Sequence, residues 1–340
     1  MKALQTTKPY ELRFMEIDKP AIMEDTQVIV QMKAVGICGS DVHIYHGTSP
    51  VATYPRIMGH EMVGVVHTIG TGVAAVAVGD PVIINQIVHC GTCHACVSGR
   101  PNVCFHLQVR GVHIDGGYQE YLRVNQTDLY KLPKELPFHQ AVMIEPTSIA
   151  YQALSRAEVV DTDTVLVLGA GALGKSLVKA LALTQARIIV ADVAAPRLEE
   201  ALALGAHLAI NSGDTDLVSA VQAATDGFGV TVAIDAAGIV SSLEVLAQAT
   251  CPAGRVITMG FMGESSKVKQ LHITAKELDI RGSRLQNNKF AQVIADYQAG
   301  KLHFEGLVSH QIPFEQAPQA FAMIDAGDTS IKKVVLTFDH

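Results

Sequence analysis

Residues 163–184 read DTVLVLGAGALGKSLVKALALT, and this stretch decides the fold of the second half of the chain. A run of apolar residues leads into a glycine-rich turn, which leads into a segment with helical periodicity. Downstream, the runs ARIIVAD (186–192), VTVAIDAAG (230–238) and GRVITMGF (254–261) are typical of buried strands, with helical segments between them. Apolar strands that alternate with helices predict a doubly wound parallel sheet covered by helices on both faces.

The glycine turn predicts a dinucleotide site. Gly169, Gly171 and Gly174 form G-x-G-x-x-G between a strand and a helix. The first glycine allows the tight turn, the second lets a pyrophosphate approach the backbone, and the third lets helix and strand pack closely. Asp192 ends the next strand and can accept hydrogen bonds from the adenosine ribose, which favours NAD over NADP. Arg197 lies five residues further on and could soften that preference.

The chain of 340 residues suggests about two domains, at roughly 100–200 residues each. Short strand-like runs punctuated by Gly and Pro, such as QVIVQMKAVG (27–36), indicate a β-rich first domain. After about residue 285 the sequence pattern is mixed again, and it ends in the strand-like run KKVVLTF (332–338). We therefore predict a β-rich domain from residues 1–148 and 286–340 around a nucleotide-binding domain at 149–285.

Composition narrows the classes of function. A net charge of -7 argues against a general nucleic-acid binder, which needs clustered Lys and Arg. No secretory signal is readable at the start, and no apolar run of about 18 residues suggests a membrane span. We expect a cytoplasmic, reducing compartment, where clustered cysteines more often bind metal or catalyse than form disulfides.

Four of the six cysteines lie in HCGTCHACVSGRPNVC (89–104), with the spacing C-x2-C-x2-C-x7-C. A bacterial ferredoxin run shares the first two spacings, but it continues with x3 and ends in Cys-Pro. Four thiolates suit a closed tetrahedral zinc site, which is structural. A neighbouring histidine could also join a mixed ligand set. The four candidate ligands are Cys90, Cys93, Cys96 and Cys104.

A second, sparser set of metal-binding side chains comes from three separated segments, GICGSDVHIYHG, YPRIMGHEMVGVV and AVMIEPTSIA. A cysteine, a histidine and a carboxylate can form a three-ligand zinc site with one open position, which is the catalytic pattern. Each of these residues, taken alone, more often has an ordinary structural role than a catalytic one. Their occurrence ahead of a dinucleotide motif favours the functional interpretation. The first segment offers Cys38, Ser40, Asp41, His43 and His46, the second offers His60 and Glu61, and the third offers Glu145.

These motifs, together with GVHIDGGYQEY and GAGALG, resemble the zinc-dependent medium-chain dehydrogenase/reductase family over essentially the whole chain. The stretch EPTSIA looks most like the sorbitol, threonine and L-galactonate dehydrogenase branch, which includes bacterial starvation-sensing oxidoreductases. The resemblance implies a GroES-like catalytic domain and a Rossmann domain. It implies that Cys38, His60 and Glu145 hold a catalytic zinc, with Glu61 as an alternative ligand. It also implies that Ser40 and His43 relay protons, and that the cysteine run holds a structural zinc.

The expected function is therefore NAD-linked oxidation of a secondary hydroxyl on a polyol, sugar acid or related small polar alcohol. The expected cofactors are about two zinc ions per chain and NAD, with NADP less favoured. We expect a homodimer or homotetramer that binds neither nucleic acid nor membrane. The alternatives are a regulatory protein that binds NAD and zinc with reduced turnover, an L-threonine dehydrogenase, or a zinc-free quinone-reductase type. Arg110 and His113 could meet a substrate carboxylate, or could belong to the scaffold.

Overall fold

A computed structural model describes residues 1–261, 263–327 and 331–339. By its internal contacts the chain divides into two compact units. Unit 1 comprises Met1–Glu145 and Phe290–His340, and unit 2 comprises Pro146–Lys289. The functional domain boundaries given above stay a prediction. Among the described residues, no helix has both the length and the apolar character needed to cross a membrane.

Unit 1 is built around one mixed sheet. Its main path runs β10-β6-β5-β3-β18-β17, and β9 also pairs with β3. A three-stranded sheet β2-β1-β4 and a two-stranded ladder β7-β8 complete it. Its strands are β1 (Lys2–Lys8), β2 (Glu11–Glu16), β3 (Gln27–Ile37), β4 (Arg56–Ile57), β5 (Glu61–Ile69), β6 (Pro81–Ile84), β7 (Ile87–Val88), β8 (Gln108–Val109), β9 (Tyr121–Asn125), β10 (Leu129–Lys131), β17 (His310–Pro313) and β18 (Val334–Thr337).

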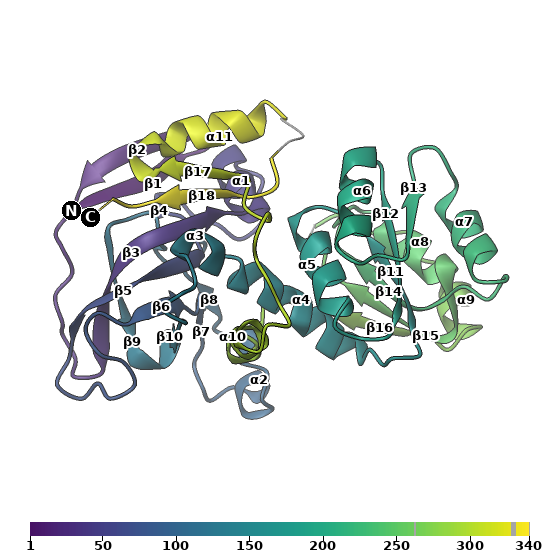
Figure 1. Cartoon of the computed structure of the whole chain (residues 1–340), viewed down its shortest axis with the longest axis horizontal. Helices are drawn as coiled ribbons and strands as arrows, with labels where there is room; N and C mark the ends of the chain where they lie inside the picture. Colours follow the sequence, from purple (N-terminus) through teal and green to yellow (C-terminus); the bar gives the residue numbers. More distant parts are fainter. Residues whose placement is uncertain (262, 328–330, 340) are drawn as a thin grey trace. The chain divides into compact units, whose positions relative to one another are not determined.

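The central strand β3 receives partners from both ends of the chain. It pairs antiparallel with β5 and with β18, so Gly36 lies opposite Glu61 on one side and Val335 on the other. Figure 1 shows the yellow carboxyl-terminal strands β17 and β18 in this unit with the purple amino-terminal strands. Val28, Val30 and Met32 of β3 belong to one core cluster, and Ile29 between them is also buried, as expected for a central strand that is covered on both faces.

Short helices close unit 1 around the sheet. The helix α1 follows β3 directly, and Gly47 ends it in the left-handed conformation. The helices are α1 (Gly39–His46), α2 (His94–Val97), α3 (Phe138–Ala141), α10 (Phe290–Gln298) and α11 (Ala317–Asp325), with 3-10 turns at Pro101–Val103, Gln126–Asp128 and Phe314–Gln316. The helix α4 (Ile144–Ala157) begins with the last two residues of the first segment of unit 1 and continues in unit 2.

Unit 2 has a six-stranded sheet in the order β13-β12-β11-β14-β15-β16, and every pair in it is parallel. This is the doubly wound order that two linked mononucleotide-binding halves produce. The strands are β11 (Thr164–Leu168), β12 (Arg187–Asp192), β13 (Leu208–Asn211), β14 (Val230–Asp235), β15 (Thr250–Thr258) and β16 (Asp279–Gly282). The helices are α5 (Ala172–Leu181), α6 (Ala195–Ala203), α7 (Leu217–Ala224), α8 (Ser242–Ala249) and α9 (Gln270–Thr274). The doubly wound parallel sheet predicted from the sequence is confirmed.

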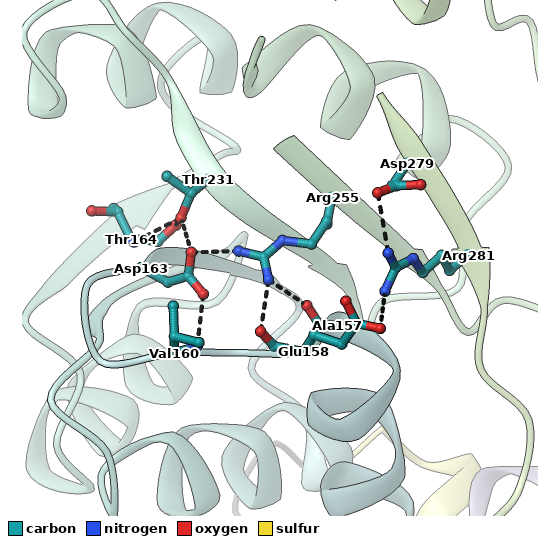
Figure 2. Close-up of polar contacts among 9 residues, drawn as sticks. All are labelled: Ala157, Glu158, Val160, Asp163, Thr164, Thr231, Arg255, Asp279 and Arg281. Atoms are coloured by element: carbon teal, nitrogen blue, oxygen red, sulfur yellow. Dashed lines mark hydrogen bonds and ion pairs between the residues drawn. The ribbon is translucent and has the colours of Figure 1, made fainter. Parts of the chain in front are cut away.

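A partly buried polar network holds the end of α4 to this sheet (Figure 2). Asp163, just before β11, accepts a hydrogen bond at 2.5 Å from the guanidinium of Arg255 and one at 2.7 Å from the hydroxyl of Thr231. Arg255 also donates to the carbonyls of Ala157 and Glu158 at 2.8 and 2.7 Å. A cation at a helix carboxyl end satisfies carbonyls that lack intrahelical partners.

Candidate metal centres and nucleotide site

Three of the predicted metal ligands meet in unit 1. One donor atom from each of Cys38, His60 and Glu61 lies within 4.8 Å of the other two. Cys38 is the residue between β3 and α1, and Glu61 is the first residue of β5. The antiparallel register that places Gly36 opposite Glu61 brings the two segments together. The sheet therefore brings Cys38 and Glu61 together although they are 23 residues apart in the sequence.

Asp41 orients this group from behind. Its carboxylate is fully buried, accepts hydrogen bonds from the amides of Cys38 at 2.8 Å and Gly59 at 3.2 Å, and lies 3.5 Å from Nδ1 of His60. Burial by itself lowers the pKa of His60, but the charges of Asp41 and Cys38 outweigh burial and raise it well above its ordinary value. A carboxylate behind a histidine fixes the ring and leaves its other nitrogen free to bind metal.

Glu61 has one partnered oxygen and one free oxygen. The ammonium of Lys333 donates to its Oε1 at 2.5 Å, and both side chains are almost completely buried. Its Oε2 is buried and has no hydrogen-bond partner among the residues that the structure describes. A buried carboxylate oxygen without a partner is costly unless a cation binds it. A thiol, an imidazole and a carboxylate are also the donors that zinc accepts, so these residues fit a zinc ion.

Glu145, the other predicted carboxylate ligand, lies outside that three-residue group of described residues. It is buried at the start of α4, where the side-chain amide of Gln86 donates to its Oε1 at 2.6 Å. Burial, together with the charge of Glu61, raises the pKa of Glu145 to about 7, although the charges of His60 and Lys333 act to lower it. Of the two predicted carboxylate ligands, Glu61 therefore lies in the group with Cys38 and His60, whereas Glu145 does not.

The predicted proton-relay residues have separate neighbours. The hydroxyl of Ser40 lies 3.4 Å from Nε2 of His60, beside the donor group. Nδ1 of His43 lies 3.0 Å from the hydroxyl of Thr48, in the exposed loop after α1. The relay between Ser40 and His43 stays a prediction. Thr48, Gln86 and Lys333 are contacts that sequence reasoning missed.

The four cysteines of residues 89–104 form a second metal-binding group. Their sulfur–sulfur distances include 3.4 Å for Cys90–Cys104, 3.6 Å for Cys93–Cys96 and 4.0 Å for Cys90–Cys96. Zinc–sulfur bonds of about 2.3 Å in a tetrahedron place the sulfurs roughly 3.8 Å apart. Hydrogen bonds from the backbone amides of Thr92 and Cys93 lower the pKa of the Cys90 thiol to about 5. The geometry fits a closed tetrahedral zinc site.

His89 is the histidine that comes nearest to joining this ligand set, with Nδ1 at 3.9 Å from the sulfur of Cys96. The four sulfurs already complete a tetrahedron, so the site does not need His89 as a ligand. All six cysteines of the chain are free thiols.

The three glycines of unit 2 occupy positions that fit their expected roles. Gly169 has a φ of 101°, which other residues rarely adopt, and it makes the turn after β11. A Cβ on Gly174 would lie 1.9 Å from the carbonyl oxygen of Gly169, so only glycine allows this close packing. Gly171 precedes α5 and has open space around it.

Asp192 sits at the end of β12 beside this turn. Its two carboxylate oxygens accept hydrogen bonds from the amides of Ala170 at 2.7 Å and Ala194 at 2.9 Å. Each oxygen keeps a second lone pair, so the carboxylate can still accept from a ribose. The guanidinium of Arg197 is half exposed and lies 3.9 Å from Asp192.

The same stretch, GAGALGKS, also matches the phosphate-binding pattern G-x4-G-K-S. That pattern needs a lysine and a serine free to reach phosphate and metal. Here Lys175 is buried and paired with Glu200 of α6, and the hydroxyl of Ser176 donates to the carbonyl of Ala172 at 3.1 Å. Both side chains are engaged within the fold, which favours the dinucleotide interpretation of the glycines.

The two candidate substrate-binding residues are part of the scaffold. Arg110 is buried and forms an ion pair at 2.7 Å with Asp128. Nδ1 of His113 accepts a hydrogen bond at 3.1 Å from the amide of Val109.

Comparison with known proteins agrees with the geometry of both units. The family model "Alcohol dehydrogenase GroES-like domain" matches residues 24–134, and the family model "Zinc-binding dehydrogenase" matches residues 172–299. The fold, the two metal-binding groups and the nucleotide site thus define a zinc-type dehydrogenase with a GroES-like domain and a nucleotide-binding domain. The chain belongs to the zinc-binding alcohol dehydrogenase family and is an enzyme of that class. The family expected from the sequence motifs is confirmed.

Two curated relatives and one solved structure illustrate the range of the family. The chain is 40% identical to the starvation-sensing protein RspB of Escherichia coli K12, over 100% of both chains. It is 34% identical to L-threonine 3-dehydrogenase of Pyrococcus furiosus, over 97% of both chains. A crystal structure of the rspB alcohol dehydrogenase of E. coli CFT073 in complex with NADH matches with a TM-score of 0.94, at 40% identity over 99% of each chain.

Proposed function

We propose that the protein is a zinc-dependent, NAD-linked oxidoreductase that oxidises a secondary hydroxyl of a polyol, sugar acid or related small polar alcohol to a ketone. The observation that carries this proposal is the group of Cys38, His60 and Glu61, with a buried carboxylate oxygen left free beside a thiol and an imidazole. Cys38 and His60 would hold the catalytic zinc together with Glu61 or Glu145, and the four-cysteine group would hold a structural zinc.

The chain's own residues supply orientation and proton transfer. When bound, zinc provides a Lewis acid for the substrate oxygen, and NAD accepts the hydride. Asp41 keeps the ring of His60 in place. Ser40 lies beside His60, where its hydroxyl can accept the proton of the substrate hydroxyl. His43, held by Thr48, is suited to take that proton onward to solvent.

The nucleotide site is proposed at the carboxyl edge of the sheet in unit 2. The turn at Gly169, Gly171 and Gly174 leaves room for a pyrophosphate beside the start of α5. Asp192 would accept from the adenosine ribose and would repel a 2′-phosphate, which favours NAD over NADP. Arg197 would contact the same end of the cofactor. The relative with NADH bound supports this preference.

The proposal extends to the setting of the enzyme. We place it in the cytoplasm, in agreement with its free thiols, and as a homodimer or homotetramer. The expected partners are the small-molecule substrate and cofactor, without nucleic acid or membrane.

The decisive experiment combines metal analysis with a substrate panel. Purified protein should contain about two zinc ions per chain and no iron. Polyols, aldonates and L-threonine are then supplied with NAD, and absorbance of the reduced cofactor is followed. The variant Cys38→Ser should lose one zinc and turnover while keeping its secondary structure. The matched control Cys251→Ser changes a free thiol of β15, outside both groups, and should keep both zinc ions and the activity.

A regulatory role is the second candidate, because a relative at 40% identity is named a starvation-sensing protein. It predicts saturable NADH binding and full zinc content with no oxidation of any alcohol in the panel. Activity restricted to L-threonine would instead support the threonine dehydrogenase alternative. Activity with NADP alone would contradict the role given to Asp192.

A further inference from the structure

The two carboxylates proposed as zinc ligands, Glu61 and Glu145, are held by chemically different partners. The ammonium of Lys333 donates directly to Glu61, and its charge also acts on Glu145, to which the neutral amide of Gln86 donates. A positive charge opposes a metal cation at the same carboxylate, but an amide does not. The two carboxylates are therefore not equivalent as metal donors.

Lys333 joins the two segments that carry the donor group. It directly precedes β18, and its ammonium donates to the carbonyl of Ile37 at 3.2 Å and to Oε1 of Glu61 at 2.5 Å. Ile37 is the residue before Cys38, and Glu61 is the residue after His60. The lysine side chain is 4% exposed and that of Glu61 is 0% exposed, so water screens this pair very little.

The free oxygen of Glu61 is the one that a metal can use. Oε1 is taken by Lys333, while Oε2 is buried without a partner in the described part of the chain. A divalent cation at Cys38 and His60 would thus share Glu61 with a fixed positive charge. In a poorly screened interior that charge reduces the attraction between carboxylate and cation.

Building on the proposed zinc centre, we infer that Lys333 acts as a brake on metal binding, since it holds Glu61 as a weakened and readily exchanged donor. Lys333 is in this sense a positioning residue that acts through Glu61. A purely structural lysine would have the opposite effect on the metal, because its loss would loosen the segments of Cys38 and His60 and speed metal release.

The test measures how fast zinc leaves the loaded protein when a chromogenic chelator is added. The phase belonging to the catalytic group is identified as the one that Cys38→Ser lacks. In Lys333→Met this phase should be slower than in the wild type by at least about tenfold, because the charge that competes for Glu61 is gone. Lys333→Arg keeps the charge and should release zinc at close to the wild-type rate.

Lys131→Met is the matched control, because it removes a lysine from an exposed ion pair with Asp80 in the same unit. It should leave the release rate unchanged. Should Lys333→Met not fold, Lys333→Gln takes its place, because it removes the charge and keeps a hydrogen-bond donor beside Glu61. Loss of the lysine should again slow release.

Equal or faster release after loss of Lys333 overturns the brake. This failure differs from failure of the zinc centre itself. If the wild type and Cys38→Ser hold the same amount of zinc, the proposed centre is wrong, and the role of Lys333 is wrong with it. If they differ by one zinc and Lys333→Met releases it no more slowly, only the brake is wrong.

Discussion

Gly36 and Glu61 are register partners on β3 and β5, and the carboxylate of Glu61 occupies the space that a side chain at position 36 would need. A Cβ built on Gly36 would lie 1.8 Å from Oε2 of Glu61. The backbone of Gly36 does not adopt a conformation that requires glycine. Position 36 therefore needs a glycine because any side chain there would overlap with the carboxylate of Glu61.

Gly36→Ala tests this relationship. The added methyl group should displace Glu61, lower the stability by about 1–3 kcal/mol and reduce zinc content, because overpacking a fully buried site forces its neighbours to move. Gly39→Ala is the matched control three residues on, where an added Cβ meets nothing within 4 Å. Urea unfolding and elemental analysis give both readouts. A Gly36→Ala protein with normal stability and full zinc would contradict the assignment.

Arg255 should contribute much more stability than its neighbour Arg281 (Figure 2). Arg255→Met leaves the 4% exposed carboxylate of Asp163 without its cation, which should cost about 3 kcal/mol or more in urea unfolding. Arg281 pairs with Glu158 and Asp279, whose side chains are 69% and 59% exposed. Arg281→Met should cost under about 1 kcal/mol. Equal losses would show that burial does not decide the strength of these pairs.

The four-cysteine group should stabilise the protein without taking part in the reaction. Cys96→Ser removes one of four sulfur ligands, so the protein should lose one zinc and melt at a lower temperature, because structural zinc contributes folding energy. Elemental analysis and circular dichroism on heating measure this, with Cys251→Ser as the control. Retention of both zinc ions and the wild-type melting temperature would exclude a structural site there.

His67 should make stability depend on pH near neutrality. Burial and the ammonium of Lys19, 2.8 Å from Nε2, lower the pKa of His67 below 6.5. The unfolded chain then binds more protons between the folded pKa and 6.5, so stability falls as the pH drops through this window and returns as it rises.

The comparison for this pH effect is with His67→Gln, which has no titrating ring. Between about pH 8 and pH 5.5 the wild type should lose stability relative to that variant in thermal unfolding. Lys19→Met removes the charge that lies beside His67 of β5, and it should reduce the difference. A difference that stays constant with pH would show that His67 keeps its ordinary pKa in the folded protein.

Most of the correct predictions came from short sequence patterns whose residues lie close together in the chain. The strand, turn and helix around Gly169 are encoded within about twenty residues, and the predicted sheet is the observed one. The cysteine group was also readable, because all four sulfurs come from one short stretch whose spacing matches a tetrahedral site. Cys38 and His60 could be selected as candidates because each lies in a compact motif.

The partners of those ligands could not be predicted in the same way. Lys333 is 272 residues from Glu61 and adjoins it only because β18 pairs with β3. A lysine before an apolar strand usually indicates a solvent-exposed strand end. Gln86 similarly reaches Glu145 across 59 residues of sequence. The choice between Glu61 and Glu145 depends on these long-range contacts, which no spacing rule contains.

The carboxyl-terminal position of β18 sets an order of assembly during synthesis. Unit 2 is continuous in sequence and is complete before β18 leaves the ribosome, and domains generally fold as they emerge. Cys38, His60 and Glu61 are likewise made long before Lys333. A nascent chain thus presents its thiol, imidazole and carboxylate before the opposing ammonium arrives. The direction of translation favours loading of the metal first and placement of the brake last.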